Sequence, residues 1–275
     1  MNAAEMGCVI SIGMFDGVHR GHRRVLARLR ETAARHALPA VVVTFDPHPR
    51  RVLQPDKAPP MLVSLRRRLA LLASTGCVDR TLVLPFDQRL REQGADEFVR
   101  HVLVERLGMR ALVVGENFAC GKGRTGTIRY LAELGQRLEF DLHPVSLRPA
   151  FDGSESMPAS STVARQLILN GDVSGAAQVL GRRHEIEGVS GGNGELILPG
   201  GMCIPHEGDY AVELVARNAD VIPARASIRY TATGPCCFVQ QARLEPGVSL
   251  TMRFIDALVS RAQTEGSRET ALVTA

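Results

Sequence analysis

The chain has 275 residues, of which 45% are hydrophobic and 23% charged, and its formal net charge is +4. This composition is typical of a globular enzyme with an ordinary hydrophobic core and about two domains. No apolar run approaches the roughly 20 residues of a membrane span, and the N-terminus lacks the basic-then-apolar pattern of a signal peptide. We therefore expect a cytoplasmic protein with no membrane partner.

The positions of the cysteines and arginines argue against a zinc- or disulfide-stabilised protein and against a nucleic-acid-binding protein. The six cysteines, at positions 8, 77, 120, 203, 236 and 237, form no Cys-x-x-Cys pair and no Cys/His ligand spacing. A zinc site or a disulfide framework is therefore not expected, and the cysteines are predicted to be reduced thiols. The densest basic cluster, Arg66-Arg67-Arg68, begins a helical stretch and is predicted to be a solvated helix face. No nucleic-acid partner is expected.

The first predicted strand, residues 9–12, runs into a turn with three glycines and two histidines before an amphipathic helix at 23–36. Gly17 and Gly21 would let a phosphate approach the backbone at the positive end of that helix. His19 and His22, three residues apart, would share one helix face and donate to phosphate oxygens. The alternative is a tight turn with two surface histidines, in which Asp16 merely caps the turn.

Strand-like and helical segments alternate through the first part of the chain. This alternation predicts a doubly wound α/β domain with a parallel sheet, which binds its ligands at the carboxyl ends of the strands. The predicted strands are residues 9–12, 40–45, 80–84 and 111–114, and the predicted helices are 23–36, 65–74, 95–107 and 172–180.

Two further loops follow predicted strands. The strand at 41–45 ends in Asp46-Pro47-His48-Pro49, which would display an exposed imidazole rigidly or be no more than a stiff surface loop. The strand at 111–114 ends in a glycine-rich loop that carries Lys122 and Arg124, two cations suited to a polyanion such as ATP. Asn117 in this loop would either bind a ligand or cap a turn.

A hydroxyl-rich segment, Ser160-Ser161-Thr162, is predicted to begin another helix, with Arg165 in its first turns. Taken by itself, a hydroxyl-rich helix start is also typical of an N-cap with no other role.

Beyond residue 188 the sequence changes to glycine, proline and short β-like runs, which predicts a small β-barrel or sandwich. The predicted organisation is a nucleotide-binding domain at 1–186, a small β domain at 187–262 and a flexible tail at 263–275.

In order along the chain, these four motifs resemble those of nucleotidylyltransferases, in the version found in the bacterial FAD synthetase family, the bifunctional riboflavin kinase/FMN adenylyltransferases. The resemblance runs from about residue 9 to about residue 188 and implies a Rossmann-like nucleotidylyltransferase domain. It departs from the family pattern at Cys120, where an aromatic residue is usual. The site residues that it implies fall into three groups. The catalytic residues are His19, His22 and Arg165; the ATP phosphates are bound by Gly13, Phe15, Asp16, Gly17, Gly21, Ser161 and Thr162; the flavin or nucleotide is bound by Pro47, His48, Pro49, Asn117, Phe118 and Arg124.

The implied reaction is transfer of AMP from ATP to FMN, giving FAD and pyrophosphate, with Mg²⁺ bridging the phosphate oxygens and no protein metal ligand. Two other interpretations stay open: a nucleotidylyltransferase for another phosphorylated acceptor, and a non-catalytic flavin- or nucleotide-binding module.

The β domain resembles the family's riboflavin kinase barrel only in part. Residues 204–212 match its Pro-x-x-Gly-Val-Tyr-Ala-Val strand, but its Gly-Phe-Pro-Thr-Ala-Asn segment is absent and its helical end is shortened. The resemblance therefore implies that kinase activity is lost. The barrel would then pack against the first domain, form a homo-oligomer, or bind flavin without phosphorylating it.

Overall fold

The computed structural model describes residues 7–146, 158–216, 220–232, 234–240 and 245–258. Within these ranges the chain forms two compact units. The first unit extends to residue 59 and resumes at 65–160; the second comprises 60–64 and the chain from 161 onward. The proposed tail at 263–275 lies outside the described residues.

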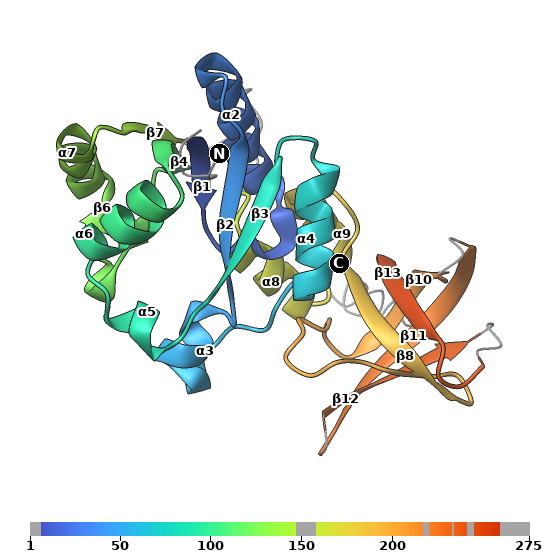
Figure 1. Ribbon diagram of the computed structural model, residues 1–275. Helices are drawn as coiled ribbons and strands as arrows, with labels where there is room; N and C mark the ends of the chain where they lie inside the picture. Colours follow the sequence, from blue (N-terminus) through green and yellow to red (C-terminus); the bar gives the residue numbers. More distant parts are fainter. Residues whose placement is uncertain (1–6, 147–157, 217–219, 233, 241–244, 259–275) are drawn as a thin grey trace, which may run out of the picture. The chain divides into compact units, whose positions relative to one another are not determined.

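The first unit is built on a five-stranded sheet in the order β3-β2-β1-β4-β7 (Figure 1). Every neighbouring pair is parallel, which confirms the doubly wound α/β prediction. The strands are β1 (Cys8–Ile12), β2 (Ala40–Asp46), β3 (Arg80–Pro85), β4 (Met109–Gly115) and β7 (Asp141–Val145). The fifth strand, β7, was not predicted.

Helices connect these strands. The longer ones are α2 (Arg20–His36), α4 (Leu65–Ser74) and α7 (Ile128–Leu138), and the short ones are α3 (Pro49–Leu53), α5 (Gln88–Glu92) and α6 (Ala95–Glu97). The 3-10 turns are η1 (Asp16–Val18), η2 (Pro55–Lys57) and η4 (Lys122–Arg124), and a small hairpin is formed by β5 (Ala119–Cys120) and β6 (Gly126–Thr127). Among the described residues, no helix combines the length and the apolar character needed to span a membrane.

The apolar pattern explains the centre of this unit. All five residues of β1 are buried, as expected for a parallel strand covered on both faces. Helix α2 packs on β1 and buries Val25, Leu26 and Leu29 at helical spacing. It begins three residues before the predicted start, because His19 supplies its N-cap.

The single α-helix predicted over residues 95–107 is wrong in detail. Three residues of α6 are followed by a π-helical segment, η3 (Phe98–Arg106). Its buried side chains are Phe98, Val99 and Leu103. The five-residue interval from Phe98 to Leu103 suits the wider π-helical turn, with its i→i+5 hydrogen bonds, better than an α-helical turn.

The strand order identifies where this unit binds ligands. The connection from β1 proceeds to β2 and β3 on one side, whereas β4 and β7 lie on the other side of β1. The order therefore reverses between β1 and β4. In open parallel sheets, ligands bind outside the carboxyl ends of the strands at such a switch point. The loops after Ile12 and after Gly115 are placed there.

The second unit contains two helices and a closed antiparallel barrel in the order β10-β11-β12-β9-β8-β13. The helices are α8 (Ser161–Leu169) and α9 (Val173–Leu180). The strands, in yellow to red in Figure 1, are β8 (Glu185–Gly192), β9 (Glu195–Ile197), β10 (Gly208–Val215), β11 (Val221–Thr231), β12 (Gly234–Gln240) and β13 (Ser249–Leu258). The small barrel expected after residue 188 is confirmed.

Alternation of buried residues builds the barrel core. Along β10, Tyr210, Val212 and Leu214 are buried at period two, and they pack with Phe254 of β13 and Ile186 of β8. The domain boundary expected at 186/187 lies within β8, which pairs with β13, and the second compact unit comprises residues 60–64 and the chain from Ser161 onward. We retain the boundary of 186/187 only as a prediction from the sequence.

Candidate active site

The loop after β1 has an unusual backbone. Phe15, Gly17 and Val18 have φ angles of 50°, 79° and 41°. Glycine adopts positive φ at little cost, but a β-branched valine rarely does. Such strain persists only where the surroundings fix the conformation, and it is frequent at ligand sites. The predicted phosphate loop is therefore held in one specific conformation.

The two motif histidines form a stacked pair at the start of α2. Their ring centroids are 3.6 Å apart with an interplanar angle of 23°, and the His22 ring also lies 5.1 Å from that of Phe15. His19 is 3% exposed, so it is not the surface histidine of the alternative interpretation. It is the N-cap: its Nδ1 accepts a hydrogen bond from the His22 amide at 3.3 Å. A neutral His19 that accepts at Nδ1 carries its proton at Nε2.

Gly21 is required by close packing rather than by its backbone angles. A Cβ atom at this position would lie 2.6 Å from the carbonyl oxygen of Ala159 and 3.1 Å from the His19 ring. The segment at 158–160 therefore contacts the start of α2 within the first unit.

Arg68 corrects one expectation from the sequence. The basic cluster was predicted to be a solvated helix face, but Arg68 is only 1% exposed. Its guanidinium donates to the carbonyl oxygen of Met14 at 3.2 Å and to that of Phe45 at 2.9 Å. The sequence did contain the signal, because Arg68 precedes the buried Leu71 and Leu72 by three and four residues, on the same face of α4.

This buried arginine joins two loops of the predicted site. Met14 belongs to the loop after β1, where its carbonyl also accepts a hydrogen bond from the Thr44 hydroxyl at 3.2 Å. Phe45 is at the end of β2. Burial lowers the pKa of Arg68 from its ordinary value, and the nearby carboxylates of Asp16 and Asp46 oppose that shift. Asp16 is itself buried.

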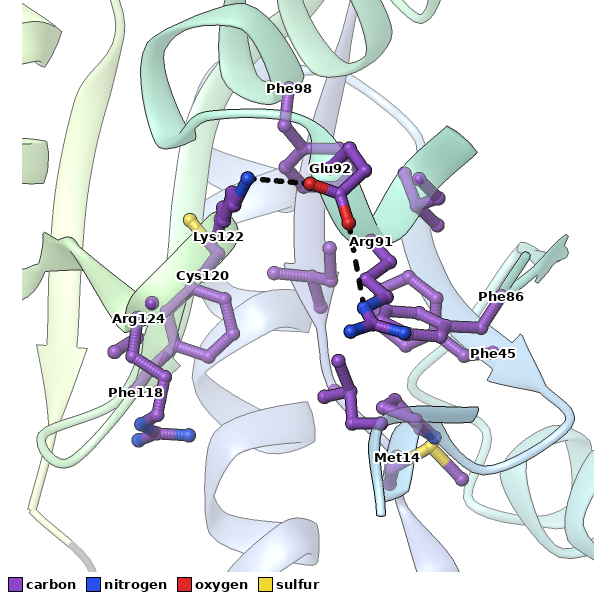
Figure 2. A pocket seen from close by; sticks show the side chains of 18 of the residues that line it. Met14, Phe45, Phe86, Arg91, Glu92, Phe98, Phe118, Cys120, Lys122 and Arg124 are labelled. Atoms are coloured by element: carbon purple, nitrogen blue, oxygen red, sulfur yellow. Dashed lines mark hydrogen bonds and ion pairs between the residues drawn. The ribbon is translucent and has the colours of Figure 1, made fainter. Parts of the chain in front are cut away.

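A cavity of about 720 Å³ opens at the switch point, between the loops that follow β1, β2 and β4. In Figure 2, Phe118 and Arg124 lie on one side of it, and Met14, Phe45 and Phe86 lie on the other. The Phe45 and Phe86 rings meet edge to face, with centroids 5.7 Å apart. Of the predicted site residues, those lining the cavity are Gly13, Pro49, Asn117, Phe118 and Arg124.

The proline-rich loop after β2 differs from the expectation of an exposed imidazole. His48 is half-buried and caps α3, because its Nδ1 accepts a hydrogen bond from the Arg50 amide at 3.0 Å. Pro49 is the first residue of that helix and lines the cavity. The loop therefore has a clear structural role beside any contact with a ligand.

The glycine-rich loop after β4 packs tightly against the start of α6. A Cβ atom at Gly121 would lie 2.4 Å from the Ala95 nitrogen, and one at Gly126 would lie 2.7 Å from both the Ala95 Cβ and the Cys120 Sγ. Burial raises the pKa of the Cys120 thiol to about 11. Neither glycine can be replaced without moving this loop.

Two cations of the same loop border the cavity. Lys122 pairs with Glu92 of α5 at 2.5 Å, and Arg124, with a φ of 58°, donates to the Asn117 carbonyl at 3.5 Å. Asn117 itself also lines the cavity.

Ser161, Thr162 and Arg165 belong to the second unit. Ser161 is the first residue of α8, and Thr162 follows it on the exposed side. The Arg165 Nε donates to the carbonyl oxygen of Pro60 at 2.7 Å, and Pro60 is part of the same unit. This contact orients the guanidinium of Arg165.

Sequence reasoning missed several residues that line the cavity: Met14, Phe45, Phe86, Arg91 and Glu92. Phe86 follows the end of β3, so its place at the carboxyl edge of the sheet was a usable signal. Arg91 and Glu92 lie in α5, a short helix whose sequence gives no comparable indication.

Comparisons with known proteins agree with this architecture. Residues 1–160 match a family described as FAD synthetase. The chain is 42% identical over 182 residues to the bifunctional riboflavin kinase/FMN adenylyltransferase of Pseudomonas fluorescens, covering 66% of this chain and 57% of that protein. It is 35% identical over 236 residues to the Escherichia coli K12 protein of the same description, covering 82% of this chain and 74% of that one. The chain thus spans little more than half of the Pseudomonas relative.

A solved structure described as a macrolide-efflux protein from Streptococcus pneumoniae has a similar fold. The TM-score is 0.78, with 98% of this chain and 95% of the other covered. At 22% sequence identity, this similarity concerns the fold alone.

Proposed function

The chain belongs to the FAD synthetase family, and from that premise we propose that it transfers AMP from ATP to FMN, giving FAD and pyrophosphate. The observation that carries the proposal is the cavity at the switch point, with aromatic side chains on both sides and a strained, histidine-bearing loop at one end of the sheet's central strand. Such a cavity suits a planar ring joined to phosphates.

The proposed step is a direct in-line displacement. An oxygen of the FMN phosphate attacks the α-phosphorus of ATP, the new P–O bond forms, and the bond from the α-phosphorus to the bridging oxygen breaks to release pyrophosphate. The nucleophile is already an anion, so positioning and charge stabilisation supply the catalysis. No covalent enzyme intermediate is required.

His19 and His22 would donate to the ATP phosphates. Two observations support this role. The N-cap hydrogen bond to Nδ1 leaves the His19 proton at Nε2, and stacking of the two rings holds both imidazoles in place. Gly13, Phe15, Asp16, Gly17 and Gly21 would shape the loop around the phosphates. The Asp16 carboxylate would act through Arg68 rather than by touching the substrate, because both groups are buried.

The ring of FMN or of the nucleotide would lie between Phe118 on one side and Phe45 and Phe86 on the other. Arg124 and Asn117 would contact it from the loop after β4, and Pro47, His48 and Pro49 from the loop after β2. Ser161 and Thr162 would donate hydroxyl hydrogen bonds to the triphosphate, and Arg165 would stabilise charge on the transferring phosphoryl group.

Mg²⁺ would accompany the triphosphate, since it prefers oxygen ligands and keeps several waters. The carboxylate of Asp46, whose side chain is 52% exposed at the end of β2, is an oxygen ligand of that kind, whereas Asp16 is buried. When bound, the ion would neutralise part of the phosphate charge.

We propose a cytoplasmic location, because the six free cysteines suit a reducing compartment. We propose no nucleic-acid partner, and a homo-oligomer remains part of the hypothesis for the barrel.

We also propose that the barrel lacks riboflavin kinase activity, because the family's Gly-Phe-Pro-Thr-Ala-Asn segment is absent from the sequence. The decisive experiment is chromatography of the products after incubating the full chain with ATP, Mg²⁺ and either FMN or riboflavin. FAD from FMN, with no product from riboflavin, is the expected result. FMN formed from riboflavin would contradict the loss of kinase activity.

A second candidate is transfer of a nucleotide to another phosphorylated acceptor. It is favoured by Cys120, a cavity residue at a position where the family usually has an aromatic one. Pyrophosphate release with another phosphate ester but not with FMN would support this candidate. Binding of ATP without pyrophosphate release from any acceptor would favour a non-catalytic module.

A further inference from the structure

Two histidines and an aspartate meet where helix α2 ends beside strand β7. His36 is the last residue of α2, and Asp141 and His143 are the first and third residues of β7. Alternate residues of a strand point to the same face, and α2 packs against β7. One potential ligand atom from each of the three side chains lies within 4.8 Å of the other two.

We propose that His36, Asp141 and His143 bind a divalent first-row transition metal ion, with Zn²⁺ as the preferred occupant. Two imidazoles and one carboxylate form a donor set that zinc accepts, and three protein ligands leave a position for water. Magnesium is disfavoured, because it selects oxygen ligands.

The hydrogen bonding of this cluster is incomplete without a ligand. In the described part of the chain, the buried Nε2 atom of His143 has no hydrogen-bond partner. The His36 Nε2 and the Asp141 Oδ2 are 3.6 Å apart, which is longer than a good hydrogen bond. Buried polar atoms are nearly always paired in folded proteins, so the unpaired imidazole nitrogen requires an explanation.

A bound ion would need only small side-chain movements. Ligand atoms around one tetrahedral zinc ion are about 3.3 Å apart, given metal–ligand distances near 2 Å. The His36 and Asp141 side chains are 31% and 63% exposed and can rotate toward the ion. His143 is more buried and would supply the fixed point of the site.

The surrounding charges are mixed. Arg28 and Arg35 are close enough to His143 to disfavour a further positive charge. Arg28, however, pairs with Glu31 at 3.3 Å, and Arg35 donates to the Thr32 hydroxyl. The Asp141 carboxylate and the negative end of the α2 dipole favour a cation at this position. For an ion to bind, the favourable interaction with two nitrogen ligands and one carboxylate must exceed the electrostatic repulsion from the two arginines.

This cluster is separate from the cavity of the proposed function. The cluster lies at the amino-terminal end of β7, whereas the cavity lies at the carboxyl-terminal ends of β1 and β4. In a parallel sheet these are opposite ends of the strands. The proposal therefore does not depend on adenylyl transfer. Cysteine and histidine spacing along the sequence could not reveal it, because its members come from segments far apart in the chain.

The test is calorimetric titration of the full chain, stripped of metal with EDTA, with Zn²⁺ alone. We expect one tight site in the wild type, and His36→Ala and Asp141→Asn each to weaken it at least tenfold, since even loss of an outer-shell partner costs roughly 10–100-fold. Both substitutions are at exposed positions, and circular dichroism verifies folding. His101→Ala is the matched control: His101 forms an exposed histidine–acid pair with Glu105 at 2.6 Å in the same unit, and the metal-ligand cluster found among the described residues does not include it.

Replacing zinc with Co²⁺ separates this site from adventitious binding by thiols. Visible absorption without a thiolate charge-transfer band, lost in His36→Ala and kept in His101→Ala, supports the proposal. A thiolate band, or equal zinc affinity in the wild type and in both site variants, overturns it. Absence of any tight zinc binding by the wild type overturns it as well.

Discussion

In the first unit the buried polar side chains of Asp16, His19 and Arg68 gather around the loop after β1, whereas in the second unit His184 and Glu185 are neighbours at the start of β8. The first group surrounds a backbone with positive φ angles. The second lies where β8 pairs with β13. The contrast indicates that burial of polar groups serves the geometry of a site in one unit and the stability of a scaffold in the other.

The contacts of the barrel pair support this contrast. The His184 Nε2 lies 2.9 Å from the Cys203 carbonyl oxygen, and its ring stacks on Phe254. The Glu185 carboxylate contacts Arg253 at 3.3 Å and Arg182 at 3.9 Å. These partners are side chains or backbone of the same unit, and the cavity at the switch point contains none of them.

The largest effect is expected from Arg68→Met. It keeps much of the volume but removes the donors to the buried carbonyls of Met14 and Phe45. We expect a loss of about 2–5 kcal/mol in the free energy of unfolding. We also expect a fall in adenylyl transfer on the order of 10²-fold from misplaced loops. Urea unfolding and steady-state kinetics measure both.

The exposed Arg66 provides the control for this change. Arg66→Met should alter stability by no more than about 0.5 kcal/mol, as is usual for surface substitutions. If Arg68→Met behaved like Arg66→Met, buried Arg68 would not organise the loops and the comparison between the units would fail.

The next effect is a pH dependence that belongs to the barrel. Burial lowers the pKa of His184 from 6.5 to about 4. As pH falls below 6.5, the unfolded chain takes up the proton first, so the stability present above that pH is lost progressively down to about pH 4. The loss attributable to His184 reaches about 3 kcal/mol.

Hydrogen exchange of peptides from β8 and β13 would follow this loss between pH 7 and pH 4. His184→Gln can still reach the Cys203 carbonyl but does not titrate, so its barrel should lose less protection over the same range. Identical pH profiles for the wild type and the variant would refute the assignment to His184.

His22→Ala tests whether a polar side chain near the loop after β1 affects turnover rather than stability. Removing one imidazole of the stacked pair should lower turnover more than about tenfold, equivalent to about 1.4 kcal/mol of transition-state stabilisation. The urea midpoint should change little, since His22 is only half-buried. A near-native rate would remove His22 from the proposed mechanism.

The smallest effect is expected from Glu185→Gln, which should change stability and leave activity almost unchanged, the opposite of His22→Ala. The amide retains the shape but loses the charge that faces Arg253 and Arg182. We expect a stability loss of about 1 kcal/mol, because the amide oxygen can still accept a hydrogen bond from Arg253, and adenylyl transfer from ATP to FMN within about twofold of the wild type. A large loss of activity at unchanged stability would show that the second unit's buried charges also serve catalysis.

Much of the first unit could be predicted because its central strands are continuous apolar runs and α2 has a clear apolar stripe. Strand β7 could not, because it contains Asp141, His143 and Pro144 and has the composition of an edge strand. The π-helical segment η3 was missed because the helical prediction assumed an α-helical period.

The candidate site was predictable at the level of loops but not of contacts. Glycine and histidine density indicated the loop after β1, yet its backbone has positive φ angles at Phe15 and Val18, which side-chain patterns do not encode, and the capping role of His19 was not predicted. Arg68 was misjudged because it is one of three consecutive residues of the same type. Only its position on the helix, on the same face as Leu71 and Leu72, distinguishes the buried arginine from the other two.

Cys120 has a consequence for chemical labelling. Cys120 is among the residues that line the cavity, but with a pKa of about 11 its thiol is almost entirely protonated at neutral pH. Thiolates are the form that alkylating reagents attack, so these reagents would modify this cysteine slowly despite its position at the cavity. A covalent inhibitor aimed at the cavity would therefore gain little from a cysteine-directed warhead, and tight binding would have to come from the aromatic walls and the bordering cations.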